Sequence, residues 1–422
     1  MPFRPRIAIV GAGPAGLTLG LLLQQRGICP TIYELRSEPT PEELAKPSGM
    51  LDLHEESGLR VMRDCGLWHG FQAAVGDCSE SCRILNPQAT VLHTDDGELA
   101  YRPEIARNEL TGLLLKSIPS DLVRWNHKIA AVRHTHHATT GAAEITLDLG
   151  ANGTAAYDFV VGADGAWSRV RTLLTDIKPF YSGAQIVTVT LRNASTKYPH
   201  LVELNGSGML YALGGGNGIM THRGVQDSIR VYAVVRTPHE NWAKAAGLAG
   251  KIAADVKTTL LGDDKIFGKW APPLQDLLAT ACDEDTKDNP NSPADILPLY
   301  MLPIGHRWER RIGVTLVGDA AHLMTPWAGE GVNMALWDSL DLACAFGEMP
   351  EVENAAAWQE ALEPRVREYE EAMLARAQGK AEETVKNMHM LLSEHGGQAM
   401  ADMFKMFEEM AAAGGAAQGG VW

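Results

Sequence analysis

Two short apolar runs in the chain are each followed at once by a glycine. Residues 7–10 are all apolar, and residues 314–317 are apolar apart from Thr315. Runs of this length, bounded by turn residues, predict parallel strands that are buried on both faces. Residues 17–25 follow the first turn as a leucine-rich segment and predict a helix. The order of strand, small-residue turn and helix is typical of the nucleotide-binding unit of α/β proteins.

Other segments carry different periodicities. Apolar and polar residues alternate within residues 186–191 and 229–235, which predicts strands of a sheet with one covered face. Residues 351–410 are rich in Ala, Glu, Met, Arg and Lys, have apolar residues near helical spacing, and predict a long helix. The expected fold class is α/β, with a discontinuous Rossmann-like nucleotide-binding domain, an inserted β-sheet domain and a long C-terminal helix.

The first glycine-rich turn has the sequence GAGPAG. Gly11 permits the tight turn, Gly13 lets the backbone approach a pyrophosphate, and Gly16 lets helix and strand pack closely. The phosphates would rest on the N-terminus of the helix, where Pro14 has no N–H to donate but still fits. We expect the cofactor to contact Gly11, Gly13, Pro14, Ala15 and Gly16. The alternative is that the hexapeptide marks only a tight strand-to-helix turn.

An acidic residue stands at the end of the next predicted strand. Residues 31–33 form that strand, and Glu34 follows it directly. Dinucleotide-binding folds place an acid about 20 residues after the glycine motif, where it accepts a hydrogen bond from a ribose hydroxyl. Glu34 is therefore the expected ribose anchor. Strand, helix and acid together favour a dinucleotide site over a simple turn, without deciding which dinucleotide binds.

A second turn follows a strand in the middle of the chain. Residues 157–161 predict this strand, and Asp164 with its following glycine leads from it toward Ser168 and Arg171. A helix that has these side chains in its first turns would place one acid and several donors near an anionic cofactor. We therefore expect Asp164 to contribute to the cofactor site, although Asp-Gly alone signals only a turn.

The strand at residues 314–317 ends in a third motif, GDAAHLMTPWAGEGVNMALWD. Asp319 is the first side chain beyond the carboxyl end of this strand, where parallel α/β sheets bind ligands, and it can accept a hydrogen bond from a ribityl hydroxyl. A helix beginning near residues 329–333 would aim free N–H groups and its positive end at the pyrimidine edge of a flavin, and so favour the anionic reduced form. These features indicate bound FAD. The residues assigned to its site are Gly318, Asp319, Pro326, Gly331, Val332 and Asn333.

Composition and charge narrow the class of partner. The 422 residues are 45% hydrophobic and 21% charged, as in ordinary soluble globular proteins. The formal net charge of −15 argues against nucleic acid or an anionic membrane surface as a partner. No segment predicts a membrane span, and the six cysteines are too scattered for a disulfide framework. We therefore expect a cytoplasmic protein, monomeric or homodimeric, that acts on a small molecule.

Two further candidates for chemistry have simpler explanations. His134, His136 and His137 lie in a polar stretch between strand-like runs, so a solvated hairpin loop is favoured over a metal site. The glycines within residues 214–218 follow a strand but open no helix, which predicts a hairpin tip. With one dinucleotide fold and no redox cysteine pair, the chain differs from flavin disulfide reductases. A nicotinamide cofactor would have to bind without a Rossmann domain of its own.

Taken together, the three motifs resemble those of a known family, the single-component FAD-dependent aromatic hydroxylases of the para-hydroxybenzoate hydroxylase type. The resemblance covers most of residues 5–345. Within that family the chain looks most like the tetracycline-inactivating flavin monooxygenases, through residues 48–54, 102–110 and 318–333. The resemblance implies that NADPH binds transiently and reduces FAD, that O2 adds at the flavin C4a carbon, and that the hydroperoxide transfers one oxygen atom to an electron-rich carbon.

The same resemblance implies further residues of the flavin site. Asp52 and Arg107 would flank the flavin, with Arg107 near its ribityl chain or ring nitrogen. The alternatives are that Asp52 caps a turn and that Arg107 only begins an amphipathic helix. Many relatives have arginine directly after the ribose acid, whereas here Leu35 intervenes before Arg36, the candidate contact on the adenosine side. Glu330 stands where a glutamine is common, which adds negative charge near the flavin.

The substrate is the least defined part of the expected function. The polar residues that grip tetracycline in the resembling enzymes have no match in residues 182–237, so the implied substrate is an aromatic or enolic polyketide-like molecule, with a tetracycline as one candidate. Trp327 and Met220 are the expected substrate contacts, and core packing is the alternative for Trp327. No residue is assigned a catalytic role. The alternative functions are a flavin oxidase or reductase of the same fold and an FAD protein that sequesters ligands without turnover.

The order of the motifs also predicts domain boundaries. The FAD-binding domain is expected to use residues 1–76, 104–178 and 290–346, and the substrate domain residues 77–103 and 179–289. Residues 347–411 would form a C-terminal bridging helix, and residues 412–422 a flexible tail. The substrate sheet would then lie over the flavin.

Overall fold

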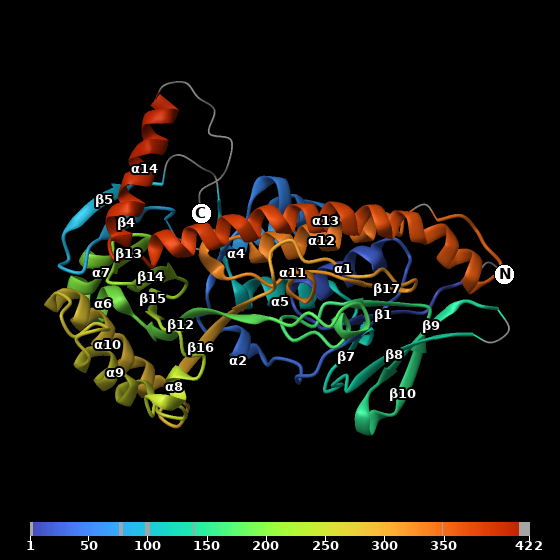
Figure 1. Ribbon diagram of the computed structural model, residues 1–422, viewed down its shortest axis with the longest axis horizontal. Coiled ribbons are helices and arrows are strands. Elements are labelled where there is room, and N and C mark those ends of the chain that lie inside the picture. The colour runs from blue at the N-terminus through green and yellow to red at the C-terminus, as the bar shows by residue number, and fades with distance from the viewer. Residues whose placement is uncertain (1–2, 76–78, 98–101, 138–139, 348, 413–422) are drawn as a thin grey trace.

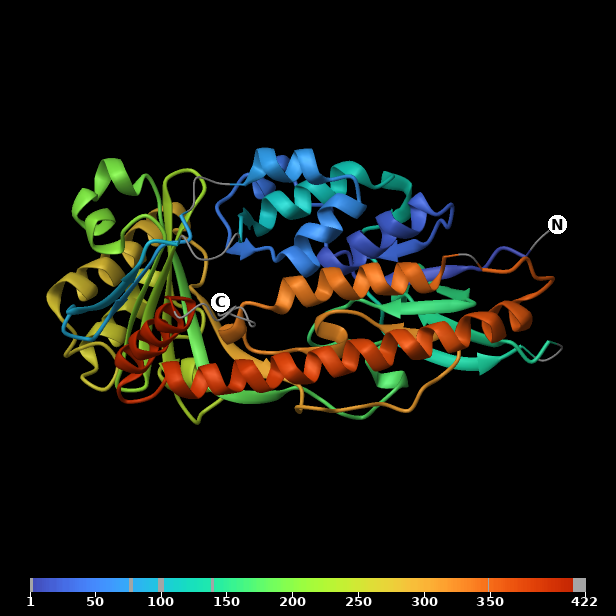
Figure 2. The same cartoon turned by 90° about the horizontal axis from the view of Figure 1, so that it is seen from above.

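The computed structural model describes residues 3–75, 79–97, 102–137, 140–347 and 349–412. The described part of the molecule is elongated, with a sheet toward each end and one long helix that runs along most of its length (Figures 1 and 2). Residues 413–422, which make up almost all of the predicted flexible tail at 412–422, lie outside the described residues. The α/β fold class predicted from the sequence is confirmed.

Five parallel strands form the sheet that was predicted to bind the cofactor. They are β1 (Ile7–Val10), β2 (Thr31–Tyr33), β7 (Val123–Arg124), β11 (Phe159–Gly162) and β17 (Val314–Leu316). The strands lie in the order β17-β11-β1-β2-β7, and all four neighbouring pairs are parallel. Because parallel strands end at the same edge of a sheet, segments from both halves of the chain meet there. The predicted strands at residues 7–10, 31–33 and 314–317 are confirmed within one residue.

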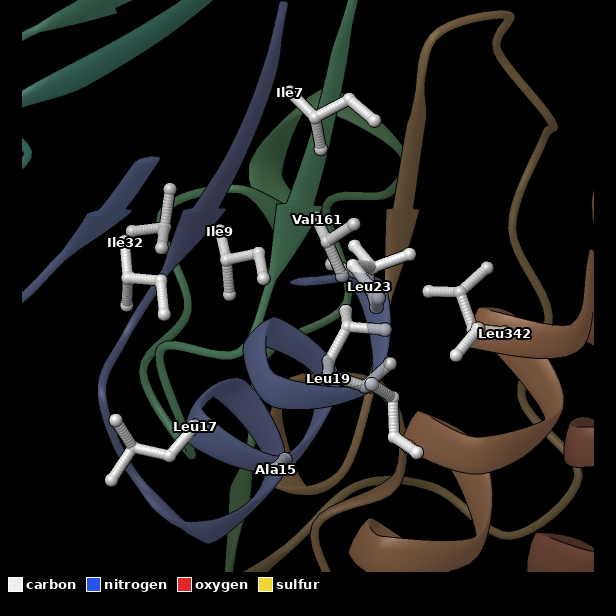
Figure 3. Close-up of a cluster of buried hydrophobic side chains, with 14 of the residues drawn as sticks. Ile7, Ile9, Ala15, Leu17, Leu19, Leu23, Ile32, Val161 and Leu342 are labelled. Atoms are coloured by element: carbon white, nitrogen blue, oxygen red, sulfur yellow. The ribbon is translucent and has the colours of Figure 1, made fainter. Parts of the chain in front are cut away.

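The core of this sheet explains why the apolar runs fold as they do. Helix α1 (Pro14–Gln25) packs on one side of the sheet, and α12 (Gly331–Ala345) packs against α1. In Figure 3 the side chains of Ile9, Leu19 and Val161 gather between sheet and helix, with Leu342 of α12 nearby. All four side chains have an exposed fraction of 0%. Burying each such side chain stabilises the fold by about 1.5–3 kcal/mol.

A seven-stranded sheet forms the other end of the molecule. Its members are β4 (Cys82–Leu85), β5 (Val91–Asp95), β12 (Phe180–Leu191), β13 (Met209–Gly214), β14 (Asn217–Gly224), β15 (Ser228–Arg236) and β16 (Asp295–Met301), in the order β16-β12-β15-β14-β13-β4-β5. Helices α9 (Ala253–Gly262) and α10 (Pro272–Asp288) cover one face, where Val187 and Val231 are buried. The opposite face, called the inner face here, carries Met220 and Val234. Residues 214–217 form the predicted hairpin tip between β13 and β14.

One strand joins a different sheet from the one that the predicted domain boundaries would give it. Strand β16 lies within residues 290–346, which were expected to belong to the FAD-binding domain, but Ile296 and Leu297 pair with β12 of the seven-stranded sheet. The chain adds an edge strand to the second sheet before it returns to the first. A polar, proline-bearing segment marks the end of a helix in sequence, but it carries no information about which sheet the following strand joins.

Two small sheets and several short helices complete the described part of the fold. Strand β3 (Met50–Asp52) pairs with β6 (Glu104–Ala106), and β8 (Ala131–His136), β9 (Ala143–Asp148) and β10 (Thr154–Tyr157) form a three-stranded sheet. The remaining helices are α2 (Pro41–Leu44), η1 (Glu55–Leu59), α3 (Arg60–Asp64), α4 (Trp68–Ala74), α5 (Arg107–Ser117), η2 (Ser120–Leu122), η3 (Gly150–Asn152), η4 (Arg171–Leu173), α6 (Ala194–Lys197), α7 (Pro199–Asn205), α8 (Trp242–Ala245), α11 (Asp319–His322) and η5 (Pro326–Ala328). His134 and His136 lie on β8, and no group of described residues has the composition of a metal site.

The C-terminal region consists of two helices where the sequence predicted one. Helix α13 (Ala355–Leu391) is separated by a short turn from α14 (Gly396–Ala412). A Cβ atom on Gly396 would lie 2.0 Å from the carbonyl oxygen of Leu391, so the chain can fold back there only at a glycine. Helix α13 packs with its Trp358 in the core of the first sheet and with Leu391 against the second, so it connects both ends of the molecule (Figure 2). No helix in the described ranges is both long and apolar enough to cross a bilayer.

Candidate active site

The three motifs singled out in the sequence and the acid Glu34 come together at the carboxyl edge of the parallel sheet. Glu34 follows β2, the turn beginning at Gly11 follows β1, Asp164 lies just beyond β11, and Asp319 lies just beyond β17. Since β2, β1, β11 and β17 are consecutive neighbours, these residues form a row across the edge of the sheet. Ligands of open α/β sheets bind at this edge.

Glycine stands at the three positions of the first motif for different reasons. Gly11 has φ +110°, and a Cβ atom there would lie 2.2 Å from the carbonyl oxygen of Ala163. A Cβ atom on Gly16 would lie 1.9 Å from the carbonyl oxygen of Gly11. Gly13, by contrast, has φ −75° and ψ −179°, and a Cβ atom there would have no atom within 4 Å. The fold therefore requires glycine at Gly11 and Gly16. It leaves open space beside Gly13, as the approach of a phosphate demands.

Glu34 is held in place for the predicted ribose contact. One carboxylate oxygen accepts a hydrogen bond from the backbone N–H of Ala12 at 2.9 Å, and the other accepts one from the backbone N–H of Arg36 at 3.0 Å. Each oxygen keeps a second lone pair, so the carboxylate can still accept hydrogen bonds from ribose hydroxyls. The side chain of Arg36 is exposed, as is that of the intervening Leu35. The role of Arg36 in binding the adenosine side stays a prediction.

Asp164 shapes its own loop. Its carboxylate accepts hydrogen bonds from Ser168 Oγ at 2.5 Å and from the backbone N–H of Arg169 at 2.6 Å. Burial raises the pKa of Asp164, and these hydrogen bonds oppose that rise. The expected helix with Ser168 in its first turn does not form, and only the short 3-10 turn η4 appears. A direct contact of Asp164 with the cofactor stays a prediction.

A buried arginine ties this loop to the third motif. Arg171 is 3% exposed and donates from Nη1 to the carbonyl oxygen of Ala320 at 2.9 Å and from Nη2 to that of Ala166 at 2.7 Å. Burial lowers the pKa of Arg171, so its guanidinium needs these acceptors. The sequence suggested that Arg171 lies near the cofactor, whereas the structure uses it to hold two cofactor-facing loops together.

Asp319 is the most available carboxylate at this edge. Its residue is exposed to solvent, and its carboxylate accepts no hydrogen bond from the part of the chain that the structure describes. Surrounding protein nevertheless desolvates it, which raises its pKa, and the nearby His322 and Arg107 oppose that shift. Arg107 begins α5, has an exposed side chain, and forms no ion pair within the described residues. An available acceptor and an available cation therefore face the same open space, as the ribityl chain of FAD requires.

The first turn of α12 supplies backbone donors. The helix begins at Gly331, and the first of its N–H groups to close a helical hydrogen bond is that of Met334, which donates to Glu330 O at 2.9 Å. The N–H groups of Gly331, Val332 and Asn333 therefore have no helical acceptor, and a Cβ atom on Gly331 would point into open space. This arrangement suits an anionic flavin ring edge.

The side chain of Asn333 has a structural task that the sequence did not indicate. Its Oδ1 accepts hydrogen bonds from the backbone N–H of His54 at 3.0 Å and from Ser57 Oγ at 3.2 Å. Its Nδ2 donates to the carbonyl oxygen of Asp52 at 2.9 Å. Asn333 therefore fastens the segment after β3 to the start of α12, and only its backbone N–H is left for a cofactor.

A row of alternating charges surrounds this junction. Asp52 Oδ2 lies 2.8 Å from His54 Nε2, and His54 Nδ1 lies 3.4 Å from Glu330 Oε2. The other oxygen of Glu330 pairs with Nζ of Lys380 on α13. Burial by itself lowers the pKa of His54, but the hydrogen bonds with Asp52 and Glu330 outweigh it and raise the pKa to about 9. The side chain of Asp52 thus acts within this network, and its contact with the flavin stays a prediction.

This network predicts a pH-dependent contribution to stability. The folded pKa of His54, about 9, lies above its ordinary value of 6.5. The stabilisation is therefore fully present below about pH 6.5 and is lost as the pH rises through about 9. We expect the Tm difference between the natural protein and a His54→Gln variant to be largest near about pH 6 and to shrink toward about pH 10. A Tm difference that stays constant across this range would contradict a charged His54.

A second buried pair holds the third motif, and the sequence analysis missed its carboxylate. His322 Nε2 lies 2.5 Å from Asp338 Oδ2, which also accepts the backbone N–H of Gly318 at 3.0 Å. Asp338 is 0% exposed, and its other oxygen accepts a hydrogen bond from Arg376 of α13 at 3.4 Å. Burial lowers the pKa of His322, but Asp338 outweighs it and the net shift is upward. The pair fixes the turn that presents Asp319.

The inner face of the seven-stranded sheet lies against these elements. Met220 pairs across the strands with Tyr211 and Tyr232 and is partly exposed. His222 Nε2 lies 2.7 Å from Glu104 Oε2 on β6, which joins the inner face to the small β3-β6 sheet. Trp327 is 2% exposed and packs with the inner-face side chains, as the core-packing alternative has it. The contacts of Met220 and Trp327 with a substrate stay predictions.

A cavity of about 320 Å³ opens at one end of the inner face. Gly183 and Arg236 line it from the sheet, and Met388, His389 and Leu392 line it from the end of α13 and the turn that follows. Met388 and Leu392 belong to the same apolar cluster as Trp327, so the cavity adjoins that cluster. Its volume is at the lower end of the range of small-molecule sites, about 300–1,000 Å³.

Fold and site together define a flavoprotein of the α/β class with an inserted β-sheet. The family model described as "FAD binding domain" matches residues 4–245 and 301–381. The chain belongs to this family. It is 33% identical to Monooxygenase penA of Penicillium thymicola, over 95% of this chain and 98% of that relative. It is 35% identical to Monooxygenase asqM of Emericella nidulans, over 92% of this chain and 96% of that relative.

Solved structures have the same fold. HpxO of Klebsiella pneumoniae, in complex with FAD and uric acid, superimposes with a TM-score of 0.73 at 20% identity, over 96% of this chain and 93% of that one. The tetracycline destructase Tet(51) superimposes with a TM-score of 0.67 at 17% identity, over 100% of both chains. The chain is therefore an FAD-dependent monooxygenase, and the predicted family and its cofactor FAD are confirmed.

Removal of the Asp319 carboxylate should weaken FAD binding without harming the fold. A hydrogen bond to a charged group contributes about 1.5–3 kcal/mol, so the Asp319→Ala variant should bind FAD about 10- to 100-fold more weakly. Because no described residue donates to this carboxylate, the Tm of the FAD-free protein should change little. Fluorescence titration of FAD into both proteins measures the difference, and an unchanged Kd would rule out the assigned contact.

Proposed function

We propose that the protein uses NADPH and O2 to hydroxylate an electron-rich aromatic or enolic small molecule. The observation that carries the proposal is the packing of the inner face of the seven-stranded sheet against the elements at the edge of the parallel sheet. His222 and Trp327 make these contacts. Bound FAD supplies the redox chemistry, since it takes a hydride from NADPH and then activates O2 for transfer of one oxygen atom to the substrate. The protein residues bind, orient and shield the reactants.

The proposed FAD contacts follow the row at the sheet edge. The pyrophosphate would be held beside Gly13 at the N-terminus of α1, and Glu34 would accept hydrogen bonds from the ribose hydroxyls. Asp319 and Arg107 would hold the ribityl chain, and the first N–H groups of α12, at Gly331 and its two successors, would donate to the pyrimidine edge. These donors stabilise negative charge on the reduced ring, which is the form that reacts with oxygen.

The inner face supplies the proposed substrate contacts. Met220, which is partly exposed, provides apolar surface for a ring, and the buried Trp327 belongs to the same apolar cluster. The cavity beside Met388 gives the ring a place to enter. Nε2 of His222 is hydrogen-bonded to the buried Glu104. Nδ1 of His222 has no partner among the described residues. With the Nε2 hydrogen donated to Glu104, Nδ1 of His222 can take a proton from a phenol or enol, which makes the neighbouring carbon more electron-rich. This proton transfer is part of the proposal.

The proposed substrate class is based on one relative, one solved structure and the inner face. One relative, at 26% identity, is the 3-amino-4-hydroxybenzoate 2-monooxygenase PtmB3 of Streptomyces platensis, and the HpxO structure holds uric acid. Both ligands are small, electron-rich rings with ionisable groups. The cavity is small, so a hydroxylated monocyclic or bicyclic ring fits the proposal better than a tetracycline, which would need more of the inner face. The protein works as a monomer or a homodimer.

Oxygen transfer can be tested directly. The purified, FAD-loaded protein is mixed with NADPH and a panel of phenols, short aromatic polyketides and tetracyclines under ¹⁸O2. The expected result is substrate-stimulated NADPH consumption with one ¹⁸O atom in the product by mass spectrometry. Hydrogen peroxide without a labelled product for every compound would instead indicate an oxidase. Bound FAD with no stimulated NADPH consumption would indicate a protein that only sequesters ligands.

A further inference from the structure

The carboxylate of Glu330 lies at an unfavourable place for the proposed chemistry. Glu330 is the residue directly before α12, and it is 7% exposed. In the proposed arrangement the N–H groups just after it face the flavin edge where negative charge develops on reduction. A buried carboxylate at this point repels that charge and cancels much of the effect of the helix N-terminus.

Two cations offset this carboxylate. Nζ of Lys380 pairs with Glu330 Oε1, and His54 Nδ1 lies 3.4 Å from Oε2. Burial raises the pKa of Glu330, but His54 and Lys380 outweigh it and the net shift is downward, so the carboxyl is ionised at neutral pH. Burial lowers the pKa of Lys380, but Glu330 outweighs it and the net shift is upward, so the amine is charged.

The surrounding charges alternate and sum to zero. Arg102 lies 4.0 Å from Asp52, Asp52 pairs with His54, and Lys380 lies 3.3 Å from Glu383 as well as against Glu330. The row therefore contains three cations, Arg102, His54 and Lys380, and three anions, Asp52, Glu330 and Glu383. Removal of Lys380 alone leaves one net negative charge beside the first turn of α12.

We propose that Lys380 is a positioning residue that raises the reduction potential of the bound FAD by neutralising Glu330. The proposal rests on the proposed placement of the flavin edge at the N-terminus of α12. Lys380 acts at a distance, through the charge of its partner, and has no contact with the flavin. The side chain reaches the site from α13, the helix that also packs on both sheets. Docking of α13 therefore controls how readily the flavin accepts electrons, in addition to bracing the fold.

The test is a double-mutant cycle read out as a reduction potential. The proteins are the natural chain, Lys380→Met, Glu330→Gln, and the variant with both changes, each loaded with FAD and titrated anaerobically against a redox dye at about pH 8. Lys380 is partly exposed, so its substitution leaves the core intact. The matched control is Lys386→Met, which removes the same charge from an exposed position on the same helix.

The Lys380→Met variant should shift the equilibrium between oxidised and reduced FAD about tenfold toward the oxidised form, a fall in potential of about 30 mV for a two-electron couple. Glu330→Gln should raise the potential by a similar amount, because it removes a negative charge beside the flavin edge. The variant with both changes should lie near the natural value, because the two lost charges cancel. Lys380→Arg should restore the natural value. The control Lys386→Met should have the same reduction potential as the natural protein.

Two results would overturn the proposal. In one, Lys380→Met has the natural potential; in the other, the variant with both changes keeps the full fall in potential of Lys380→Met, so that the charge of Glu330 does not act on the flavin. The measurement needs only bound FAD, so it is independent of whether a hydroxylated product is ever found. A protein that binds FAD and shows the expected reduction potentials in the four variants supports this inference even if the substrate assay fails. A tenfold shift without any labelled product would count against the proposed function alone.

Discussion

The Gly13→Val protein is expected to fold and to lose FAD. The backbone of Gly13, at φ −75° and ψ −179°, is open to any residue, and a Cβ atom there would meet no protein atom within 4 Å. The added isopropyl group would instead occupy the space that the pyrophosphate needs at the N-terminus of α1. Loss of the phosphate contacts should weaken FAD binding by about 100-fold or more, equivalent to about 2.7 kcal/mol. The purified variant should be colourless, with circular dichroism like that of the natural FAD-free protein.

The neighbouring glycine provides the matched control. Gly11→Val places a side chain against the carbonyl oxygen of Ala163, 2.2 Å from the Cβ atom, at φ +110°. That variant should fail to fold, because both the contact and the backbone conformation exclude a β-branched residue. A Gly13→Val protein that stays yellow through gel filtration would show that the phosphates do not approach this turn. A Gly13→Val protein that does not fold would show that the glycine serves packing instead.

Much of the fold could be predicted from the sequence because its signals are local. The strand at residues 7–10 and the helix after it follow from a short apolar run, and Gly11 and Gly16 mark the turn between them. The alternating residues of 229–235 fix which side chains of β15 share a face. The assignment to FAD came from the spacing of three such local motifs together with a resemblance to a known family. The family comparison confirms this assignment.

The rest depends on contacts between distant residues. Lys380 is one basic residue among many in a long helix, and nothing near it in sequence indicates its pairing with Glu330. Asn333 was predicted as a cofactor contact, but its side chain holds His54 and Asp52, which lie 279 and 281 positions away. The sheet that β16 joins could not be predicted either, because its partner strand β12 lies far from it in the sequence. Spacing along the chain shows where a strand lies and leaves its neighbours undefined.

The third motif shows how such distant contacts support the site. Asp319 was found from the sequence because it follows a strand, yet it is held in position by Asp338, which the sequence did not single out. Asp338 fixes His322 and the backbone of Gly318 from α12, and Arg376 of α13 contacts its second oxygen. The cofactor-facing turn is therefore braced by a buried charge that never meets the cofactor.

Substitution of Asp338 should cause the largest loss of stability at this site. Asp338→Ala leaves His322 and the N–H of Gly318 buried without their acceptor, and breaking a buried pair in this way costs about 3–5 kcal/mol. For a protein of this size we expect a fall in Tm on the order of 10 °C. Differential scanning fluorimetry of the FAD-free and FAD-loaded proteins measures it. FAD should recover part of the loss, because it binds only the folded state.

Asp341 on the same helix is the matched control for this prediction. Its carboxylate accepts a hydrogen bond from Arg376 Nη1 at 2.8 Å, but its side chain is 31% exposed, whereas that of Asp338 is 0% exposed. Since exposed ion pairs contribute about 1 kcal/mol or less, Asp341→Ala should lower the Tm by only a few degrees. If the two variants melted at the same temperature, the buried pair with His322 would contribute nothing beyond a surface ion pair. The turn that presents Asp319 would then owe its position to backbone packing alone.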